Sequence, residues 1–333
     1  MDTQIAARDE EKHRENRGPE NHEPVDYIRK VGKGKTLTRN LSLTEAREAF
    51  SQLFAGRFTP SQTGAFLQAL RIKELSQEEL DGLMEALAFP ASNFPDVSSG
   101  GFVLNLASDT SRKGGYASYL AAALLAAKGM PVGVVRSDPM LSGNQASWDE
   151  TQRALSPSSA PAAVVVDVYD LIPALRNLRQ IRQELGFRSC LHTAEKLLNP
   201  WPRKPLVLGI SHRHYAERLA ENLRRRGLTG KIVLGNHGTP DLVLHKETEI
   251  WEVLPGGDVR VLSLHPGDLG LQPDPTVYSL GFFPKWREEC AREGFGVLGP
   301  VLLYHVAFLR YVAGEVSEPK EGLLSWSQVS GVA

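Results

Sequence analysis

In the first third of the chain, hydrophobic side chains recur every three or four positions, which is the period of an amphipathic helix. Three hydroxyl residues each stand three positions before a Glu or Gln: Ser42, Thr59 and Ser76. This pattern is a capping box, in which the two side chains satisfy N–H groups that the first helical turn leaves open. Pro60 fits the first position of the second helix, and Gly56 ends the helix before it. The segment therefore predicts a small helical domain.

After residue 100 the pattern changes to short apolar runs separated by longer amphipathic stretches. The runs are predicted to be buried strands, at 102–106, 131–135, 164–168, 206–210 and 231–234. We expect one amphipathic helix over 170–185, another that Ser211 caps and Gly227 ends, and a third over 300–312. Strand–helix–strand units imply parallel pairing. The sequence therefore predicts an α/β domain with a mainly parallel central sheet.

Charge is nearly balanced over the whole chain, with a formal net charge of −1 at pH 7, but it is unevenly distributed. Residues 171–231 hold thirteen Lys and Arg against four Asp and Glu, whereas 232–333 hold seven against thirteen. The balance argues against an obvious nucleic-acid binder, yet the basic segment suits phosphate groups. The two cysteines, Cys190 and Cys290, stand far apart in the sequence, which predicts reduced buried thiols.

Several stretches carry little apolar surface. Residues 1–24 are rich in charge and lack the apolar segment of a secretory signal, so they are predicted to be a disordered tail. Residues 156–163, rich in Ser, Pro and Ala, predict a linker or flexible loop. The longest apolar run, at 119–127, is far short of a membrane span. We therefore expect a cytoplasmic protein without a membrane partner.

Blocks 58–73, 184–200 and 311–322 resemble one known family, and the first of them ends in the signature Leu-Arg-Ile-Lys. Together they resemble the anthranilate phosphoribosyltransferases, which are family-three glycosyltransferases related in fold to pyrimidine nucleoside phosphorylases. The resemblance runs from about residue 27 to residue 329. It implies a small helical domain, a larger α/β domain, an active site in the cleft between them, and homodimers formed through the helical domain.

The resemblance also implies how the two domains share the chain. Residues 25–95 would form the first helical segment, and 169–203 the segment that returns to the helical domain. The α/β domain would take 96–168 and 204–333. Within the signature, Arg71 and Lys73 are expected on the polar surface of the helical domain near the dimer contact.

The loop that would bind the phosphoribosyl donor departs from the family pattern. Family members cradle pyrophosphate with Gly-Thr-Gly-Gly-Asp, and the matching residues 105–109 keep only the Asp. The glycines matter because a bare backbone can approach the phosphates. A family Lys-His-Gly-Asn-Arg stretch likewise loses its Lys and His at 133–138. The loop still joins hydroxyls, cations and glycine before a helix, so we predict phosphate binding by Ser108, Asp109, Thr110, Ser111, Arg112, Lys113 and Gly114.

At most one carboxylate remains where the family has the Asp-Glu pair that holds magnesium. The resemblance implies a weak metal site made by Asp109 and Asp241. One carboxylate binds Mg²⁺ poorly unless substrate phosphates supply the other ligands. Mg²⁺ is therefore expected only together with a pyrophosphate ligand, and otherwise no cofactor is expected.

The acceptor side of the site is better preserved. Arg188 matches the arginine that meets the substrate carboxylate, a role that suits its bidentate fork. His192 stands near the place where the family has Asn. His237 and Gly238 keep a family His-Gly pair and are predicted to line the same cleft.

Blocks 191–197 and 210–212 resemble a divergent second branch of the family, whose members keep the scaffold but lose the usual donor loop. At least one bacterial member binds nucleic acid without clear sequence preference. The candidates for that role are Arg176, Arg179, Arg182, Arg224, Arg225 and Arg226. For the last three, the alternative is that they complement the negative end of a helix.

Three functions remain open at this point. The first is phosphoribosyl transfer to an aromatic amine, by displacement of pyrophosphate from C1 of the ribosyl donor. The second is a non-catalytic homodimer that binds nucleic acid through a basic cleft. The third is a scaffold that binds another phosphorylated small molecule.

Overall fold

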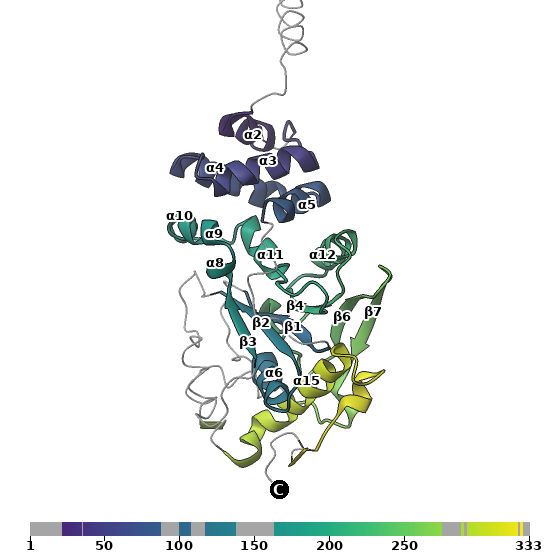
Figure 1. Cartoon of the computed structure of the whole chain (residues 1–333). Helices are drawn as coiled ribbons and strands as arrows, with labels where there is room; N and C mark the ends of the chain where they lie inside the picture. The colour runs from purple at the N-terminus through teal and green to yellow at the C-terminus, as the bar shows by residue number, and fades with distance from the viewer. Residues whose placement is uncertain are drawn as a thin grey trace, which may run out of the picture.

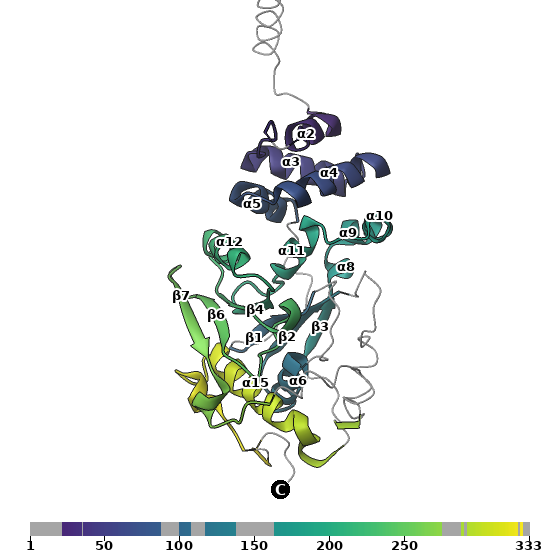
Figure 2. The same cartoon turned by 180° about the vertical axis from the view of Figure 1, so that it is seen from behind.

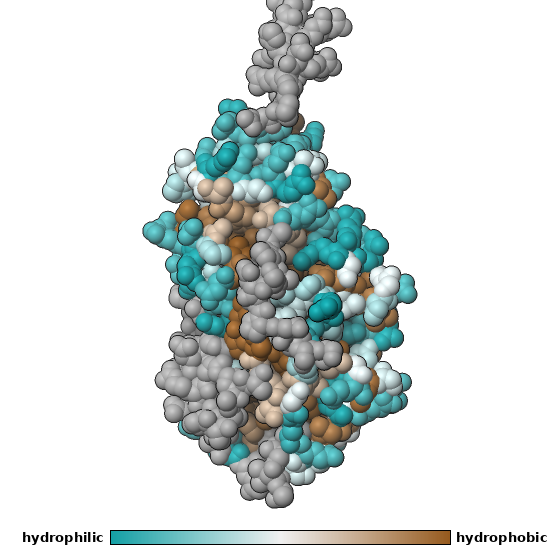
Figure 3. Space-filling model, viewed as in Figure 1, coloured by the Kyte–Doolittle hydropathy of each residue, from teal (hydrophilic) through white to brown (hydrophobic). Residues whose placement is uncertain are grey.

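The structure is a computed structural model, and it describes residues 22–34, 36–87, 100–107, 117–137, 163–274, 288–289, 292–325 and 327–328. Most of the predicted tail and of the predicted 156–163 linker lies outside these ranges. Figure 1 shows a layer of helices at the top of the molecule and a helix-covered sheet below it. Figure 3, in the same view, shows hydrophilic residues over the top and flanks and hydrophobic residues gathered in a band beneath the upper helices.

The upper layer of Figure 1 is the helical domain, formed by α2 (Pro24–Val31), α3 (Leu43–Phe54), α4 (Pro60–Lys73) and α5 (Gln77–Ala86). All three predicted capping boxes are confirmed. At the start of α4, the Thr59 N–H donates to Gln62 Oε1 over 2.9 Å, and the Gln62 N–H donates to Thr59 Oγ1 over 3.2 Å. In the core, the rings of Phe50 and Phe66 lie 5.5 Å apart and join α3 to α4.

The end of α4 is fixed by a buried ion pair rather than by surface charge. Lys73 pairs with Glu79, whose side chain is fully buried, while that of Lys73 is only 8% exposed. The second oxygen of Glu79 accepts the Leu41 N–H over 2.8 Å. The sequence had suggested that Lys73 lies on the polar surface of the helical domain, and this prediction is wrong. Its ammonium group is buried because it compensates the buried carboxylate of Glu79.

The lower part contains one sheet that, in the described residues, has seven strands in the order β3-β2-β1-β4-β5-β6-β7. The first five are parallel, and the last two form an antiparallel extension at one edge. The predicted strands correspond to β1 (Phe102–Asn105), β2 (Val132–Arg136), β3 (Val164–Asp167), β4 (Leu206–Gly209) and β5 (Gly230–Val233). The extension, β6 (Thr248–Val253) and β7 (Val259–Leu264), was not predicted.

Helices cover both faces of this sheet (Figures 1 and 2). One face packs on α6 (Ala117–Ala127) and α15 (Gly299–Val312), which share one hydrophobic core with the strands. The other face packs on α12 (Arg213–Arg225). One stretch, Phe295–Val312, is long and apolar enough to cross a membrane by length and composition alone. Most of it is buried against the sheet and α6, as in the core helix of a globular domain.

The segment expected to be one amphipathic helix over 170–185 is instead three short helices. These are α8 (Val168–Leu171), α9 (Pro173–Asn177) and α10 (Arg179–Leu185), and α11 (Cys190–Lys196) follows them. Pro173 causes the first break, because proline lacks an N–H and takes the first position of a new helix. Both α10 and α11 contact α4, so this segment lies directly under the helical domain.

Short 3-10 turns complete the described parts of the α/β domain: η2 (Asn236–Gly238), η3 (Pro266–Leu269), η4 (Glu293–Leu298) and η5 (Pro319–Gly322). The turn η2 follows β5 and lies at the end of the parallel strands.

Candidate functional site

A cleft of about 410 Å³ opens where the helical domain meets the α/β domain. Its walls come from the end of α4, from α11 with the residues before it, and from α12 with the segment that joins it to β4. Three cationic side chains line it: Arg71, Arg188 and Lys196. These residues come from two distant segments of the chain, and the packing of α11 against α4 brings them together.

Arg71 reaches this cleft because of its position in the last turn of α4. Leu70 before it is buried in the helical core, while Ile72 after it is 73% exposed. Successive residues on a helix point in different directions, so the signature divides its roles. Leu70 anchors the helix, Lys73 compensates Glu79, and Arg71 faces the cleft.

Lys196, at the end of α11, fixes the floor of the cleft. Its Nζ donates to the carbonyl oxygens of Gly209 and Gly238, each over 2.6 Å. These bonds tie the end of β4 to the turn η2. The turn itself is tightly packed, because a Cβ on Gly238 would lie 2.3 Å from Ser211 Oγ and its φ is +75°. Gly238 therefore shapes the cleft through its backbone.

Ser189 and His192 bring polar atoms into the buried part of the cleft. Ser189 is 5% exposed, and its Oγ has no hydrogen-bond partner among the described residues. Burial lowers the pKa of His192 well below its usual value, and the positive charges of Lys196, Arg182, Arg188 and Arg71 lower it further. The imidazole is therefore neutral near pH 7, and its surroundings favour a negative ligand.

Aromatic rings line the mouth of the cleft. The rings of His212 and His214 lie 5.7 Å apart and 17° from parallel, and the His214 and Tyr215 rings lie 4.2 Å apart. Both histidines are exposed. Flat ligands bind to such surfaces by stacking.

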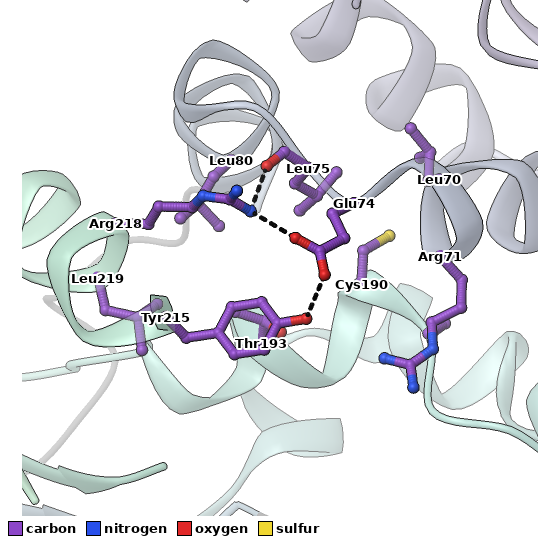
Figure 4. A pocket seen from close by; sticks show the side chains of 11 residues that line it. Leu70, Arg71, Glu74, Leu75, Leu80, Cys190, Thr193, Tyr215, Arg218 and Leu219 are labelled. Atoms are coloured by element: carbon purple, nitrogen blue, oxygen red, sulfur yellow. Dashed lines mark hydrogen bonds and ion pairs between the residues drawn. The ribbon is translucent and has the colours of Figure 1, made fainter. Parts of the chain in front are cut away.

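A cross-domain bridge closes one side of the site (Figure 4). Glu74, just after α4, accepts hydrogen bonds from Tyr215 Oη over 3.5 Å and from Arg218 over 3.4 Å. Arg218 also donates to the Leu75 carbonyl over 2.8 Å. The bridge lines a small side pocket of about 40 Å³ that adjoins the cleft and shares residues with it. The carboxylate of Glu74 is thus already engaged by partners from α12.

Two of the four predicted acceptor residues, Arg188 and His192, line the cleft together. Gly238 lies beside it through its carbonyl contact with Lys196. His237 has an exposed side chain and is not among the lining residues, and its backbone is left-handed, with φ of +51°. The predicted phosphate loop, Ser108 to Gly114, lies outside the described residues.

Asp241, proposed as a weak metal ligand, has a structural task. Its Oδ1 accepts the N–H and hydroxyl of Ser118 over 2.8 and 2.6 Å, and its Oδ2 accepts the Thr239 hydroxyl over 2.9 Å. These bonds hold the start of α6 to the turn after β5. In the described parts of the chain, no group of three or more His, Cys, Asp or Glu could hold a metal ion. The described residues therefore do not fit Mg²⁺ on their own.

One nucleic-acid candidate is corrected outright. Arg182 was predicted to contact nucleic acid, but its side chain is 2% exposed and pairs with the buried Glu195 over 2.5 Å. Its charge is used inside the protein, because an unpaired carboxylate at that depth would be costly.

The other arginine candidates do not form one band. Arg176 and Arg179 belong to the α9–α10 region and Arg224 to Arg226 to the end of α12, and α11 lies between these regions in both views (Figures 1 and 2). Several already have partners: Arg176 pairs with Asp170, Arg224 with Glu221, and Arg225 with Glu221 and Asp81. Arg179 lies over the Tyr169 ring, and Arg226 donates to the Leu197 carbonyl.

Sequence reasoning did not assign Arg71, Ser189, Lys196 and Tyr215 to the site, although the structure places all four on the cleft. The first three lie inside the blocks that carry the family resemblance. Their role could not be read from spacing, because only the fold brings α4 and α11 side by side.

Comparisons with known proteins agree with this architecture. Residues 25–89 match a glycosyl transferase family's helical bundle domain, and residues 163–277 match its a/b domain. Together the two matches span more than half of the chain. An uncharacterized protein of Aquifex aeolicus is 28% identical over 89% of this chain and 95% of its own length. The anthranilate phosphoribosyltransferase of Corynebacterium glutamicum is 24% identical over 84% of this chain and 85% of its own length.

Solved structures show the same fold. Anthranilate phosphoribosyltransferase from Thermus thermophilus superimposes with a TM-score of 0.71 at 23% identity, covering 91% of this chain and 94% of that one. The Saccharomyces cerevisiae enzyme in complex with PRPP and Mg gives a TM-score of 0.70 at 16% identity, over 92% and 93% of the two chains. The chain belongs to the family-three glycosyltransferases, the family of anthranilate phosphoribosyltransferase.

Proposed function

We propose that this protein binds a flat, negatively charged small molecule in the cleft between its domains, as the acceptor of a phosphoribosyltransferase-like reaction. The observation that carries the proposal is the convergence of Arg71, Arg188 and Lys196 on one cavity of about 410 Å³. That volume falls in the range of small-molecule sites. The neutral His192 adds a hydrogen-bonding group without adding charge.

The roles of the residues follow from their chemistry. Arg188 presents a planar fork that matches a carboxylate or phosphate through two parallel hydrogen bonds. Arg71 comes from α4 and Arg188 from the residues before α11, so a ligand held by both arginines would join these two segments. Lys196 keeps the turn η2 in place and contributes positive potential. These groups position and neutralise charge, which is what an oxocarbenium-like transfer requires of a protein.

The donor side of the reaction stays a prediction from the sequence. Phosphate binding is proposed for the loop from Ser108 to Gly114. No step of the reaction is assigned to Mg²⁺, because the carboxylate of Asp241 is occupied by Ser118 and Thr239. Mg²⁺ is expected only together with a pyrophosphate ligand, and the yeast relative has been solved in complex with PRPP and Mg. A homodimer formed through the helical domain and a cytoplasmic location also remain predictions.

Nucleic-acid binding is the second candidate function. The arginines proposed for it lie on two separate surfaces, but the exposed rings of His212 and His214 stand beside the cationic cleft. Stacking rings next to cations are the usual elements of single-strand binding. Fluorescence anisotropy with an arbitrary oligonucleotide tests this candidate. Binding that falls steeply with salt supports it, and a flat response at low salt removes it.

A thermal-shift series tests the first candidate. We expect anthranilate and other aromatic acids to raise the melting temperature of the wild-type protein, and neutral analogues such as aniline to leave it unchanged. Arg188→Gln should abolish the shift. Arg29→Gln is the matched control, because Arg29 has a side chain that is 68% exposed and lies in α2, away from the cleft. Equal shifts in wild type and Arg188→Gln would contradict the proposal.

A further inference from the structure

We infer that the cleft is built for a phosphomonoester carried by a flat ring system, rather than for a single carboxylate. This inference rests on the proposed function, since it names the class of anion that the cleft binds. It is carried by the charge of the walls, by one buried hydroxyl without a partner, and by the rings at the mouth.

Cationic side chains outnumber acidic ones among the residues that line the cleft. Arg71, Arg188 and Lys196 are the cations, and the acidic lining residue is Glu74. The Glu74 carboxylate accepts hydrogen bonds from Tyr215 and Arg218. Part of its negative charge is therefore already balanced by Arg218. A carboxylate brings one negative charge, whereas a phosphomonoester brings about −1.5 to −2 at pH 7 and three strong acceptor oxygens. The dianion matches the cationic walls better.

Ser189 supplies the second observation. Its hydroxyl is buried, lines the cleft and has no hydrogen-bond partner in the described structure. Buried polar atoms are nearly always satisfied, so an open one in a cleft indicates a ligand atom. Ser189 directly follows Arg188, so both can serve the same anion. After an arginine takes two oxygens of a phosphate, a third oxygen remains to accept the hydroxyl, whereas a carboxylate would have to share one of its two oxygens between the arginine and the hydroxyl.

The mouth of the cleft suits the rest of such a ligand. His212, His214 and Tyr215 form a continuous run of rings with successive centroids 5.7 and 4.2 Å apart. A heteroaromatic ring stacks on such a surface with little sequence or substituent specificity. A ligand with its phosphate between the arginines and its ring on the histidines would extend from the floor of the cleft to its mouth.

Two sources could supply this chemistry: a free mononucleotide-like metabolite, or the 5′-phosphate at the end of a nucleic acid. Calorimetry distinguishes them with five probes: AMP, adenosine, anthranilate, and one oligonucleotide prepared once with a 5′-phosphate and once with a 5′-hydroxyl. We expect AMP to bind at least about tenfold more tightly than adenosine or anthranilate, the factor that one charged hydrogen bond supplies. If the phosphorylated oligonucleotide binds more tightly than AMP and its 5′-hydroxyl form does not, the source is a nucleic-acid end.

Two variants connect the binding to the named atoms. Ser189→Ala should weaken AMP binding several-fold without lowering the melting temperature, because it removes a hydroxyl that no protein group uses. His214→Ala should weaken AMP but leave inorganic phosphate unchanged. Thr193→Ala is the control for Ser189→Ala, as a hydroxyl that also lines the cleft but is less buried.

The outcomes separate the inference from the proposed function. If anthranilate binds as tightly as AMP or more tightly, the cleft is an anion site but the inferred class is wrong. If none of the probes binds at millimolar concentration, both the inference and the proposed function fail. If Ser189→Ala binds AMP as well as wild type does, the hydroxyl has no part in recognition and the inference is overturned.

Discussion

Arg182 and Glu195 form an ion pair that is almost wholly enclosed beneath the cleft, with 2% and 1% of their side chains exposed and 2.5 Å between Nη1 and Oε1. The pair fastens α10 to α11, and α11 carries His192 and Lys196. The two helices under the cleft, α10 and α11, are therefore held together by two charges that are thirteen residues apart in the sequence.

Removing the arginine of this pair should destabilise the protein severely. We expect Arg182→Met to lower the free energy of unfolding by about 3–5 kcal/mol, because it leaves Glu195 buried without compensation. The control is Arg176→Met, whose pair with Asp170 is exposed and should contribute under about 1 kcal/mol. Urea denaturation measures both. Equal losses of unfolding free energy in the two variants would contradict the claim that burial makes the Arg182–Glu195 pair essential.

Within the family signature, we expect Arg71 to contribute to ligand binding and Lys73 to contribute to stability. Arg71→Gln is expected to weaken aromatic anions at least about tenfold, by loss of a charged hydrogen bond, with little change in stability. Lys73→Met should do the reverse. It leaves the buried Glu79 uncompensated and costs about 3–5 kcal/mol, while the ligand affinity of the folded fraction is kept. Calorimetry and urea titration on each variant test this division, and a stability loss in Arg71→Gln with unchanged binding would invert it.

The turn η2 should need a glycine at position 238, both because a side chain has no room there and because the backbone is left-handed. Gly238 and Gly227 have φ of +75° and +65°, but only at Gly238 would a Cβ collide, at 2.3 Å from Ser211 Oγ. Gly227→Ala should cost about 1–2 kcal/mol, the usual penalty of a left-handed alanine. Gly238→Ala should cost more and also weaken ligand binding, since Lys196 holds the Gly238 carbonyl. Equal costs would mean that Ser211 moves aside freely.

Stability should fall on mild acidification because of buried neutral histidines. Burial lowers the pKa of His305, whose Nε2 accepts the Leu242 N–H over 2.8 Å and whose Nδ1 lies 2.7 Å from the Val301 carbonyl. Below about pH 6.5, the ordinary pKa of histidine, this side chain is protonated in the unfolded chain but stays neutral in the folded protein. The free energy of unfolding then drops by up to about 1.4 kcal/mol per pH unit for each such histidine.

His192 adds to this slope in the same direction. Urea midpoints measured from pH 7.5 to pH 5 should therefore fall in wild type. In His305→Gln the free energy of unfolding should be lower than in wild type and should depend less steeply on pH, because unfolding takes up as much as one proton fewer. An unchanged slope in that variant would place the titration elsewhere.

Much of the fold was predictable because its signals are local. The capping boxes at Ser42, Thr59 and Ser76 lie within a few residues of the helices that they start, and the buried strands are short apolar runs. The extension β6–β7 was missed because Glu252 interrupts its apolar pattern. That carboxylate is fully buried and satisfied by Lys231 over 2.8 Å and Arg260 over 2.5 Å, partners known only from the folded sheet.

The site was predicted less completely for the same physical reason. Arg188 and His192 carried a family resemblance, and both line the cleft. The surface role given to Arg182 was wrong because its partner Glu195 lies on another helix. The contribution of Arg71 could not be read from a helical pattern, since the pattern does not say which domain that face of α4 will meet.

The central claim is that a flat anion binds between Arg71 and Arg188, and a crystal structure of the protein grown with saturating AMP or anthranilate tests it most directly. The account predicts density for the anionic group within hydrogen-bond distance of the Arg188 guanidinium and Ser189 Oγ, with the ring beside His214. A cleft that stays empty at saturating ligand, or a ligand bound elsewhere on the protein, would contradict it.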